Sequence, residues 1–202
     1  MSEINFGTFN ALVIGMRCKD FVIVGVTKRS LYGPIIVSEK ATVTRIFDNI
    51  ILAFAGHISD IQYIFREAEW LIRIGRLERE RRLSITEIAN EIGLLMFSYK
   101  LFPNIVFGII GGVDVDGRTK LYDIDPLGSL LEENYTAAGL CADVAIGLLE
   151  ENYDENMTLE NAKKLFTKIL SSVAKRNVLV GMYAELSWVS KKSSGTDNVK
   201  LL

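Results

Sequence analysis

The sequence predicts an α+β domain in which two antiparallel β-sheets pack face to face between two pairs of helices, a four-layer α-β-β-α sandwich. Strand-like apolar runs separated by short polar turns occupy most of residues 11–56. Helical periodicity then appears in two blocks of two helices, and each block is followed by further strands. Short turns favour antiparallel pairing, and runs that are apolar without alternation are typical of strands covered on both faces.

The first stretch contains five apolar runs. The Lys19-Asp20 turn joins the first two runs into a hairpin, and a Tyr-Gly-Pro turn follows the basic pair at 28–29. The runs are ALVIGMRC (11–18), FVIVGVT (21–27), PIIV (34–37), VTRIF (43–47) and NIILAFAG (49–56).

The first helix pair follows Gly56. Apolar spacing predicts a helix that begins near residue 58 and ends in the charged run RLERERR (76–82), which we interpret as a solvated helix end or, in an assembly, a contact with a neighbour. Ser84 and Glu87 have the spacing of a capping box and predict the start of a second helix.

The second half repeats this order. Strands are predicted at 104–113 and 120–124, joined by the turn Asp114-Val-Asp-Gly117, and a turn at 125–128 follows. Helices are predicted at about 141–153 and 158–176, the second capped by Thr158. A last strand at 182–190 leads into a tail, 190–202, that we expect to be mobile.

Composition sets further limits. A chain of 202 residues with 49% hydrophobic content suits one domain, 1–202, with residues 1–10 as a short N-terminal extension. A net charge of −2 gives no reason to expect nucleic acid or a membrane surface as partner. Cys18 and Cys141 are expected to be buried thiols in a reducing compartment, in preference to a disulfide between them. His57 is the single histidine, so we expect neither a histidine metal site nor a cofactor and interpret it as a helix-entry residue.

In addition to this pattern, the chain resembles the β-type subunits of the proteasome core particle, which have the N-terminal nucleophile (Ntn) hydrolase fold. The resemblance extends from Ala11 to about Val189. It is carried by KDFVIVGVTKR with Tyr32-Gly33, FAG (54–56) followed by Asp60, IIGGVDVDGRTKLYDIDPLGS (109–129), AAGLCADVAIGLLEENY with the later MTLENA, and KRNVLVG (175–181).

Active members of that family use an N-terminal threonine, whose hydroxyl attacks the peptide carbonyl while its own α-amine takes the proton. The resemblance places Ala11, preceded by Asn10, at the nucleophile and Thr27 at the supporting carboxylate. Thr42 falls at the lysine, although a shift of one or two residues would bring Lys40 close. The serine, aspartate and serine of the supporting network fall on Leu140, Asn177 and Val180, and the oxyanion glycine is retained as Gly56.

The resemblance therefore implies a non-catalytic β subunit. Its expected partners are proteasome α subunits and active β subunits in stacked heptameric rings that enclose an ATP-dependent degradation chamber, with unfolded proteins as indirect partners. The expected compartment is the cytoplasm, and also the nucleus in a eukaryote. In the family, the segment equivalent to Asp125 and Ser129 borders the substrate pocket of a neighbour. A ring of this chain alone would be inactive, so we expect co-assembly with active paralogues.

Three alternatives remain open. Gly7-Thr8 resembles a processing junction, and cleavage there would give an active threonine peptidase. A free-standing binding protein of the same fold would be a monomer. Asp114 and Asp116 form either a metal-binding pair or acid/base dyad or, as we prefer, the carboxylates that flank a hairpin turn.

Overall fold

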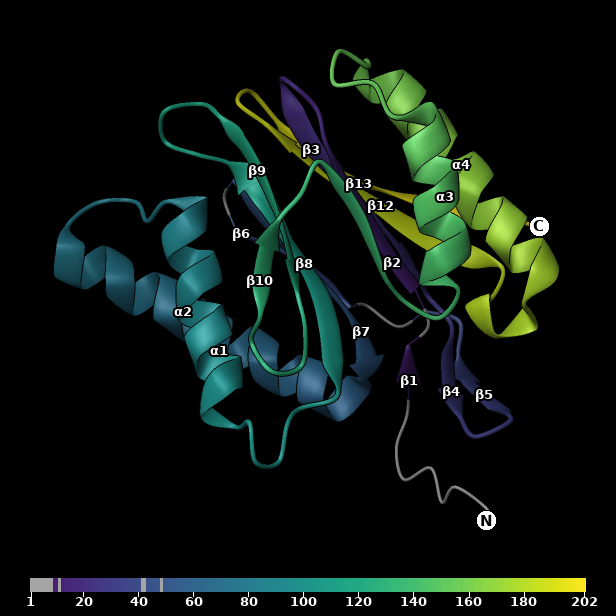
Figure 1. Ribbon diagram of the computed structural model, residues 1–202, viewed down its shortest axis with the longest axis horizontal. Helices are drawn as coiled ribbons and strands as arrows, with labels where there is room; N and C mark the ends of the chain where they lie inside the picture. Colours follow the sequence, from purple (N-terminus) through teal and green to yellow (C-terminus); the bar gives the residue numbers. More distant parts are fainter. Residues whose placement is uncertain (1–8, 11, 41–42, 48) are drawn as a thin grey trace.

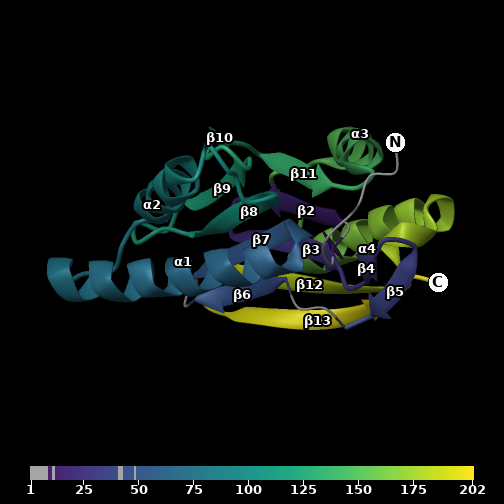
Figure 2. The ribbon, with the colours of Figure 1, turned by 90° about the horizontal axis from the view of Figure 1, so that it is seen from below.

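The computed structural model describes residues 9–10, 12–40, 43–47 and 49–202. The chain folds into four layers, with one helix pair outside each of two antiparallel sheets (Figures 1 and 2). This arrangement confirms the predicted α-β-β-α sandwich.

The larger sheet has the strand order β10-β9-β8-β7-β1-β4-β5, and β6 also pairs with β7. All of its pairings are antiparallel. Its strands are β1 (Phe9–Asn10), β4 (Ser30–Tyr32), β5 (Ile35–Ser38), β6 (Thr44–Phe47), β7 (Ile50–His57), β8 (Val106–Val113), β9 (Thr119–Ile124) and β10 (Leu130–Glu132).

The smaller sheet has the order β11-β2-β3-β12-β13 and contains the predicted hairpin. Its turn closes through a hydrogen bond of 2.8 Å from the Cys18 N–H to the Phe21 carbonyl. The strands are β2 (Leu12–Arg17), β3 (Phe21–Thr27), β11 (Tyr135–Gly139), β12 (Tyr183–Ser190) and β13 (Ser194–Lys200).

In the part of the chain that the structure describes, four α-helices form the outer layers. Helices α1 (Ile58–Arg79) and α2 (Ile85–Ser98) cover the larger sheet, and α3 (Ala142–Asn152) and α4 (Leu159–Arg176) cover the smaller one (Figure 1). Both predicted caps are confirmed. Ser84 and Glu87 form a complete capping box on α2, and the Thr158 hydroxyl accepts from the Asn161 N–H at the start of α4.

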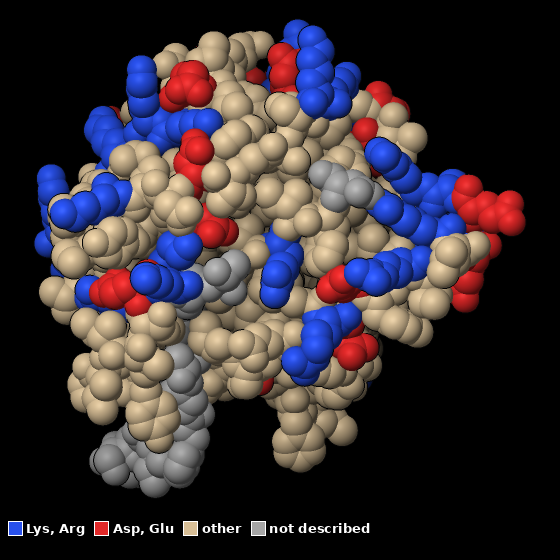
Figure 3. Space-filling view, turned by 180° about the vertical axis from the view of Figure 1, so that it is seen from behind, with Lys and Arg blue, Asp and Glu red and all other residues tan. Residues whose placement is uncertain are grey.

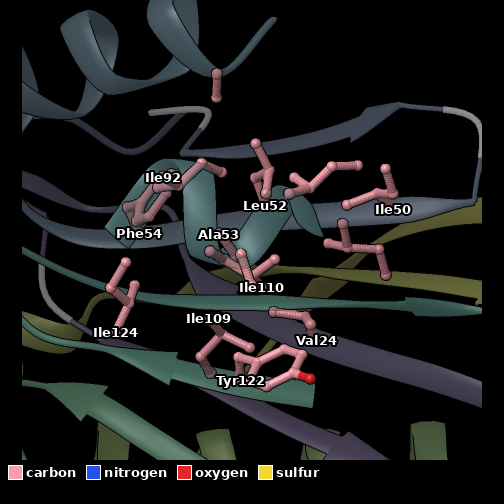
Figure 4. Close-up of a cluster of buried hydrophobic side chains, with 14 of the residues drawn as sticks. Val24, Ile50, Leu52, Ala53, Phe54, Ile92, Ile109, Ile110, Tyr122 and Ile124 are labelled. Carbon is pink, nitrogen blue, oxygen red and sulfur yellow. The ribbon is translucent and has the colours of Figure 1, made fainter. Parts of the chain in front are cut away.

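The β2–β3 hairpin is buried on both faces because its side chains alternate between two cores. Val13, Val22 and Val24 point into the core between the sheets. Leu12 and Ile14 point to the other face, into the core under α3 and α4. Figure 4 shows the first core, in which Val24 of one sheet lies in the same cluster as Ile110 and Tyr122 of the other.

The prediction of a mobile tail was wrong. The tail after residue 190 forms β13, which pairs along β12 from Ser194 to Lys200. The run 76–82 is the exposed end of α1 and the turn after it, as predicted, and two of its arginines also pair with α2. Arg79 reaches Glu87 and Glu91 of α2 at 2.9 and 3.4 Å, and Arg81 reaches Glu87 at 2.6 Å. Within the described residues, no helix is both long and apolar enough to cross a membrane.

Candidate functional site

The Thr27 side chain joins β2 and β3 at the end of the hairpin opposite its turn. The last ladder pair of the two strands is Val13 with Val26. Beyond it, the Thr27 hydroxyl accepts a hydrogen bond from the Leu12 N–H at 3.1 Å and donates to the Leu12 carbonyl at 3.4 Å. Thr27 is fully buried. Where the resemblance expects a carboxylate, the chain therefore has a neutral hydroxyl that is already satisfied by the backbone.

Ala11 and Thr42 lie outside the described residues, as do Gly7 and Thr8. Lys40 can be placed. It is exposed, and its backbone N–H donates to the Ser38 hydroxyl at 3.0 Å. It lines an open cavity of about 350 Å³ together with Lys28 and Tyr183. Among the described residues, no hydrogen bond or ion pair connects Lys40 to Thr27.

The two basic residues that follow Thr27 are each paired with a carboxylate. Lys28 Nζ lies 3.2 Å from Glu185 Oε2, and both side chains are largely buried. The Arg29 Nε donates to Glu39 Oε1 at 2.6 Å, and the Arg29 guanidinium also donates to the Val178 carbonyl. The Arg29–Glu39 pair was not predicted from the sequence. The only local signal is the basic pair after the strand, and its acidic partner lies ten residues further along the chain.

The resemblance places Gly56 at the oxyanion glycine, and the backbone at Gly56 requires glycine. Its φ of +137° favours glycine, and a Cβ atom there would overlap the carbonyl oxygen of Ile105. In the sheet, Gly56 pairs with Val106 on one side and with Asn10 of β1 on the other. Asn10 also pairs with Ser30 of β4. Residues 9–10 therefore lie as a strand between β7 and β4.

The three network positions come from two neighbouring loops. Leu140 is partly exposed at the end of β11, and Val180 is buried in the short 3₁₀ helix Val178–Val180. Asn177 caps that 3₁₀ helix, because its Oδ1 accepts from the Leu179 N–H at 2.9 Å. Its Nδ2 donates to the Cys141 sulfur at 3.1 Å. The Asn177–Cys141 hydrogen bond joins the two loops, and none of the three positions carries an acid or a hydroxyl.

Asp125 stabilises its own turn. Its Oδ1 accepts from the N–H groups of Leu127 and Ser129 at 2.8 and 2.9 Å. Burial acts to raise the pKa of Asp125, but hydrogen bonds from the Ser129 hydroxyl and from backbone N–H groups of the turn outweigh burial, and the pKa is lowered. Asp125 and Ser129 are thus brought together, in a loop that packs on α2 where Gly128 approaches Gly93.

The Asp114–Gly117 segment is the predicted hairpin turn. Asp114 Oδ1 accepts from the Val115 N–H at 2.8 Å, and Asp116 Oδ1 accepts from the Arg118 N–H at 2.9 Å. No group of three or more His, Cys, Asp or Glu side chains suited to a metal ion occurs in the part of the chain that the structure describes.

His57 precedes α1 as predicted, and its N–H donates to the Ile105 carbonyl at 2.9 Å.

Comparison with known proteins agrees with the fold. A model of the family described as "Proteasome subunit" matches residues 9–189. The chain is 36% identical over 177 residues to "Proteasome subunit beta 1" of Hyperthermus butylicus, covering 87% of this chain and 86% of that protein. It is 33% identical over 192 residues to "Proteasome subunit beta 2" of Pyrobaculum arsenaticum, covering 95% and 94%. A further β subunit, from Ignicoccus hospitalis, is 34% identical over 172 residues.

Proposed function

The chain belongs to the proteasome β-subunit family, and on that premise we propose that it is a non-catalytic, structural β subunit of the 20S core particle. It lies in the β ring beside catalytically active β subunits and next to the α ring, and it helps to enclose the degradation chamber. The observation that carries the proposal is the bonding of Thr27, a buried neutral side chain that ties the backbone of Leu12 at the position of the catalytic carboxylate.

The chemistry of active members explains why the hydrogen bonds of Thr27 matter. A threonine hydroxyl becomes nucleophilic when a free α-amine accepts its proton, and a nearby carboxylate and lysine orient and tune that amine. Here the sequence has Ala11 at the nucleophile, and Lys28 and Arg29 are both paired with carboxylates. These features support a site without proton transfer or nucleophilic attack.

Strand β1 also supports the proposal. Phe9 and Asn10 are held between β7 and β4, so residues 9–10 are part of the sheet. An active subunit needs a free amine at the start of β2. Processing at Gly7-Thr8 would leave the amine before β1, separated from Leu12 and Thr27 by a strand that is already paired on both sides.

The test uses the purified particle. We expect intact-mass analysis to give a chain that begins at Met1 or Ser2, and a probe that reacts with both the hydroxyl and the amine of an N-terminal threonine to label other β chains only. A chain that begins at Thr8, takes up the probe and loses the label in a Thr8→Ala variant would overturn the proposal. A Ser2→Ala variant is the matched control for substitution in the same segment.

A silent subunit can still influence specificity. We propose that the turn of Asp125 and Ser129 borders the substrate pocket of the adjacent active subunit. Because the Asp125 carboxylate already accepts N–H groups within its own turn, it acts there by fixing the shape of the loop.

A further inference from the structure

Strand β13 leaves one edge of the smaller sheet unpaired. It is the last strand in the order of that sheet, and within the described residues no strand pairs with its outer side. In Figure 2 it runs along the lower border of the molecule. A strand with a free edge can add another extended segment to its sheet through backbone hydrogen bonds.

The register of β12 with β13 identifies the backbone groups at that edge. The Ser190 N–H donates to the Ser193 carbonyl at 2.8 Å, and the Leu201 N–H donates to the Met182 carbonyl at 2.8 Å. Hydrogen-bonded pairs alternate along an antiparallel ladder, so the odd-numbered residues of β13 bond to β12. The N–H and C=O groups of its even-numbered residues, within Ser194–Lys200, therefore point away from the sheet.

A groove lies beside this edge, between β13 and α4. It has a volume of about 400 Å³, and it is lined by Asp197 and Val199 of β13 and by Lys164, Thr167 and Lys168 of α4. Side chains alternate between the two faces of a sheet, and neighbouring strands keep the same alternation. Every second side chain of a strand added to β13 would therefore point to the face on which α4 presents these residues.

The groove has an excess of positive charge. Its two acidic side chains, Glu160 and Asp197, both pair with Lys163, at 3.7 and 2.9 Å. Lys164 and Lys168 are exposed, and neither forms an ion pair within the described residues. Like charges four residues apart destabilise a helix, so a carboxylate in the groove would relieve their repulsion. Figure 3, which views the molecule from the side of β13, shows lysine and arginine side chains gathered on the left, where α4 lies.

The edge and the groove together favour one kind of occupant. Nucleic acid would meet the lysines, but it has no peptide N–H and C=O groups to pair with the edge of β13. A second copy of this chain, paired edge to edge along β13, would bring the lysines of two α4 helices together. We propose that β13 binds an extended acidic segment of a partner protein as an added strand, with carboxylates of that segment paired to Lys164 and Lys168. The proposal does not depend on whether the chain is catalytic.

Fluorescence anisotropy of a labelled peptide with the full-length chain tests the kind of ligand. The peptide alternates glutamate and threonine over seven residues, so that all its carboxylates share one face of a strand. We expect saturable binding that weakens as salt is added. A peptide with lysine in place of glutamate should not bind, and neither should one with proline in place of threonine, which keeps the charge but cannot form the ladder. Equal binding of the acidic peptide and either control would overturn the proposal.

Variants test the site, with unfolding midpoints to confirm that each one folds. Thr196→Pro removes an outward N–H and keeps the bonds to β12, and it should weaken binding by about tenfold, whereas Thr196→Val keeps that N–H and should bind normally. Replacing Lys164 and Lys168 together by glutamine should also weaken binding by about tenfold. Lys175→Gln, at an exposed position of α4 outside the groove, is the control. Unchanged affinity in Thr196→Pro or in the double lysine variant would overturn the proposal, as would self-association of the chain that Thr196→Pro abolishes.

Discussion

Replacing Thr27 by valine tests whether the Thr27 hydroxyl stabilises the fold. Valine keeps the branched shape and removes the hydroxyl. Because the site is fully buried, the Leu12 N–H would lose its acceptor at 3.1 Å and water could not replace it. Leaving a buried donor unsatisfied costs about 1–3 kcal/mol, and the longer bond to the Leu12 carbonyl, at 3.4 Å, adds little. We expect the free energy of unfolding to fall by about 2 kcal/mol.

Urea denaturation, followed by tryptophan fluorescence, measures this change. With a slope of about 2 kcal/mol per molar urea, the midpoint should fall by about 1 M. Hydrogen exchange of the Leu12 amide should become faster in Thr27→Val and stay slow in Thr27→Ser, which keeps the hydroxyl. An unchanged midpoint together with a protected Leu12 amide in Thr27→Val would refute the assigned role of Thr27.

Three other predictions concern titration, thiol reactivity and specificity. The Arg81 guanidinium, followed by the Ser84 backbone, lowers the pKa of Glu87 to about 2. The ordinary glutamate value is about 4.3, so the stabilisation by Glu87 is complete above that pH and is lost as the pH falls through about 2. Glu87→Gln should remove this acid dependence from urea titrations at different pH values. Burial, reinforced by the charges of neighbouring carboxylates, raises the pKa of Cys18 to about 12. At neutral pH a maleimide should therefore modify the partly exposed Cys141 before Cys18, and equal labelling of the folded chain in peptide mass spectra would contradict this. Asp125→Asn should alter the cleavage preference of the adjacent active subunit in the assembled particle, and identical peptide profiles would count against it.

The sequence predicted best those features whose determinants are close together in the chain. The capping box of α2 needs only Ser84 and Glu87, three residues apart, and the turn at Asp114–Gly117 needs only its own carboxylates and a glycine. Apolar runs also predicted the strands of the β2–β3 hairpin, because both faces of that hairpin are covered. Such local and periodic signals do not depend on distant parts of the chain.

Strand β13 could not be predicted in this way because its determinants are distant and polar. Its backbone pairs with β12, the Thr196 hydroxyl lies 3.1 Å from that of Ser187, and Asp197 pairs with Lys163 of α4 at 2.9 Å. None of these contacts requires a periodic spacing of apolar residues in the sequence. A polar segment of this kind is indistinguishable from a tail until its partner strand is placed.

In the candidate site, too, the residue identities could be predicted from the sequence but their contacts could not. The resemblance gave the position of Thr27, but its bonds to Leu12 follow from the register at the end of the β2–β3 ladder. The pairing of Arg29 with Glu39 and the Val178 carbonyl likewise joins segments whose proximity is set by the tertiary fold. A residue's identity shows that an acid is absent, whereas the structure shows what the replacement does.

Strand β1 does more than pair with β7 beside Gly56. In the described part of the chain, β4 pairs only with β1 and β5, so β1 is the sole link that joins the β4–β5 hairpin to the rest of the larger sheet. Active subunits discard the segment before the nucleophile in order to work. In this chain residues 9–10 of that segment join the exposed β4–β5 hairpin to the larger sheet, so under the proposed function the segment contributes to the architecture of the subunit.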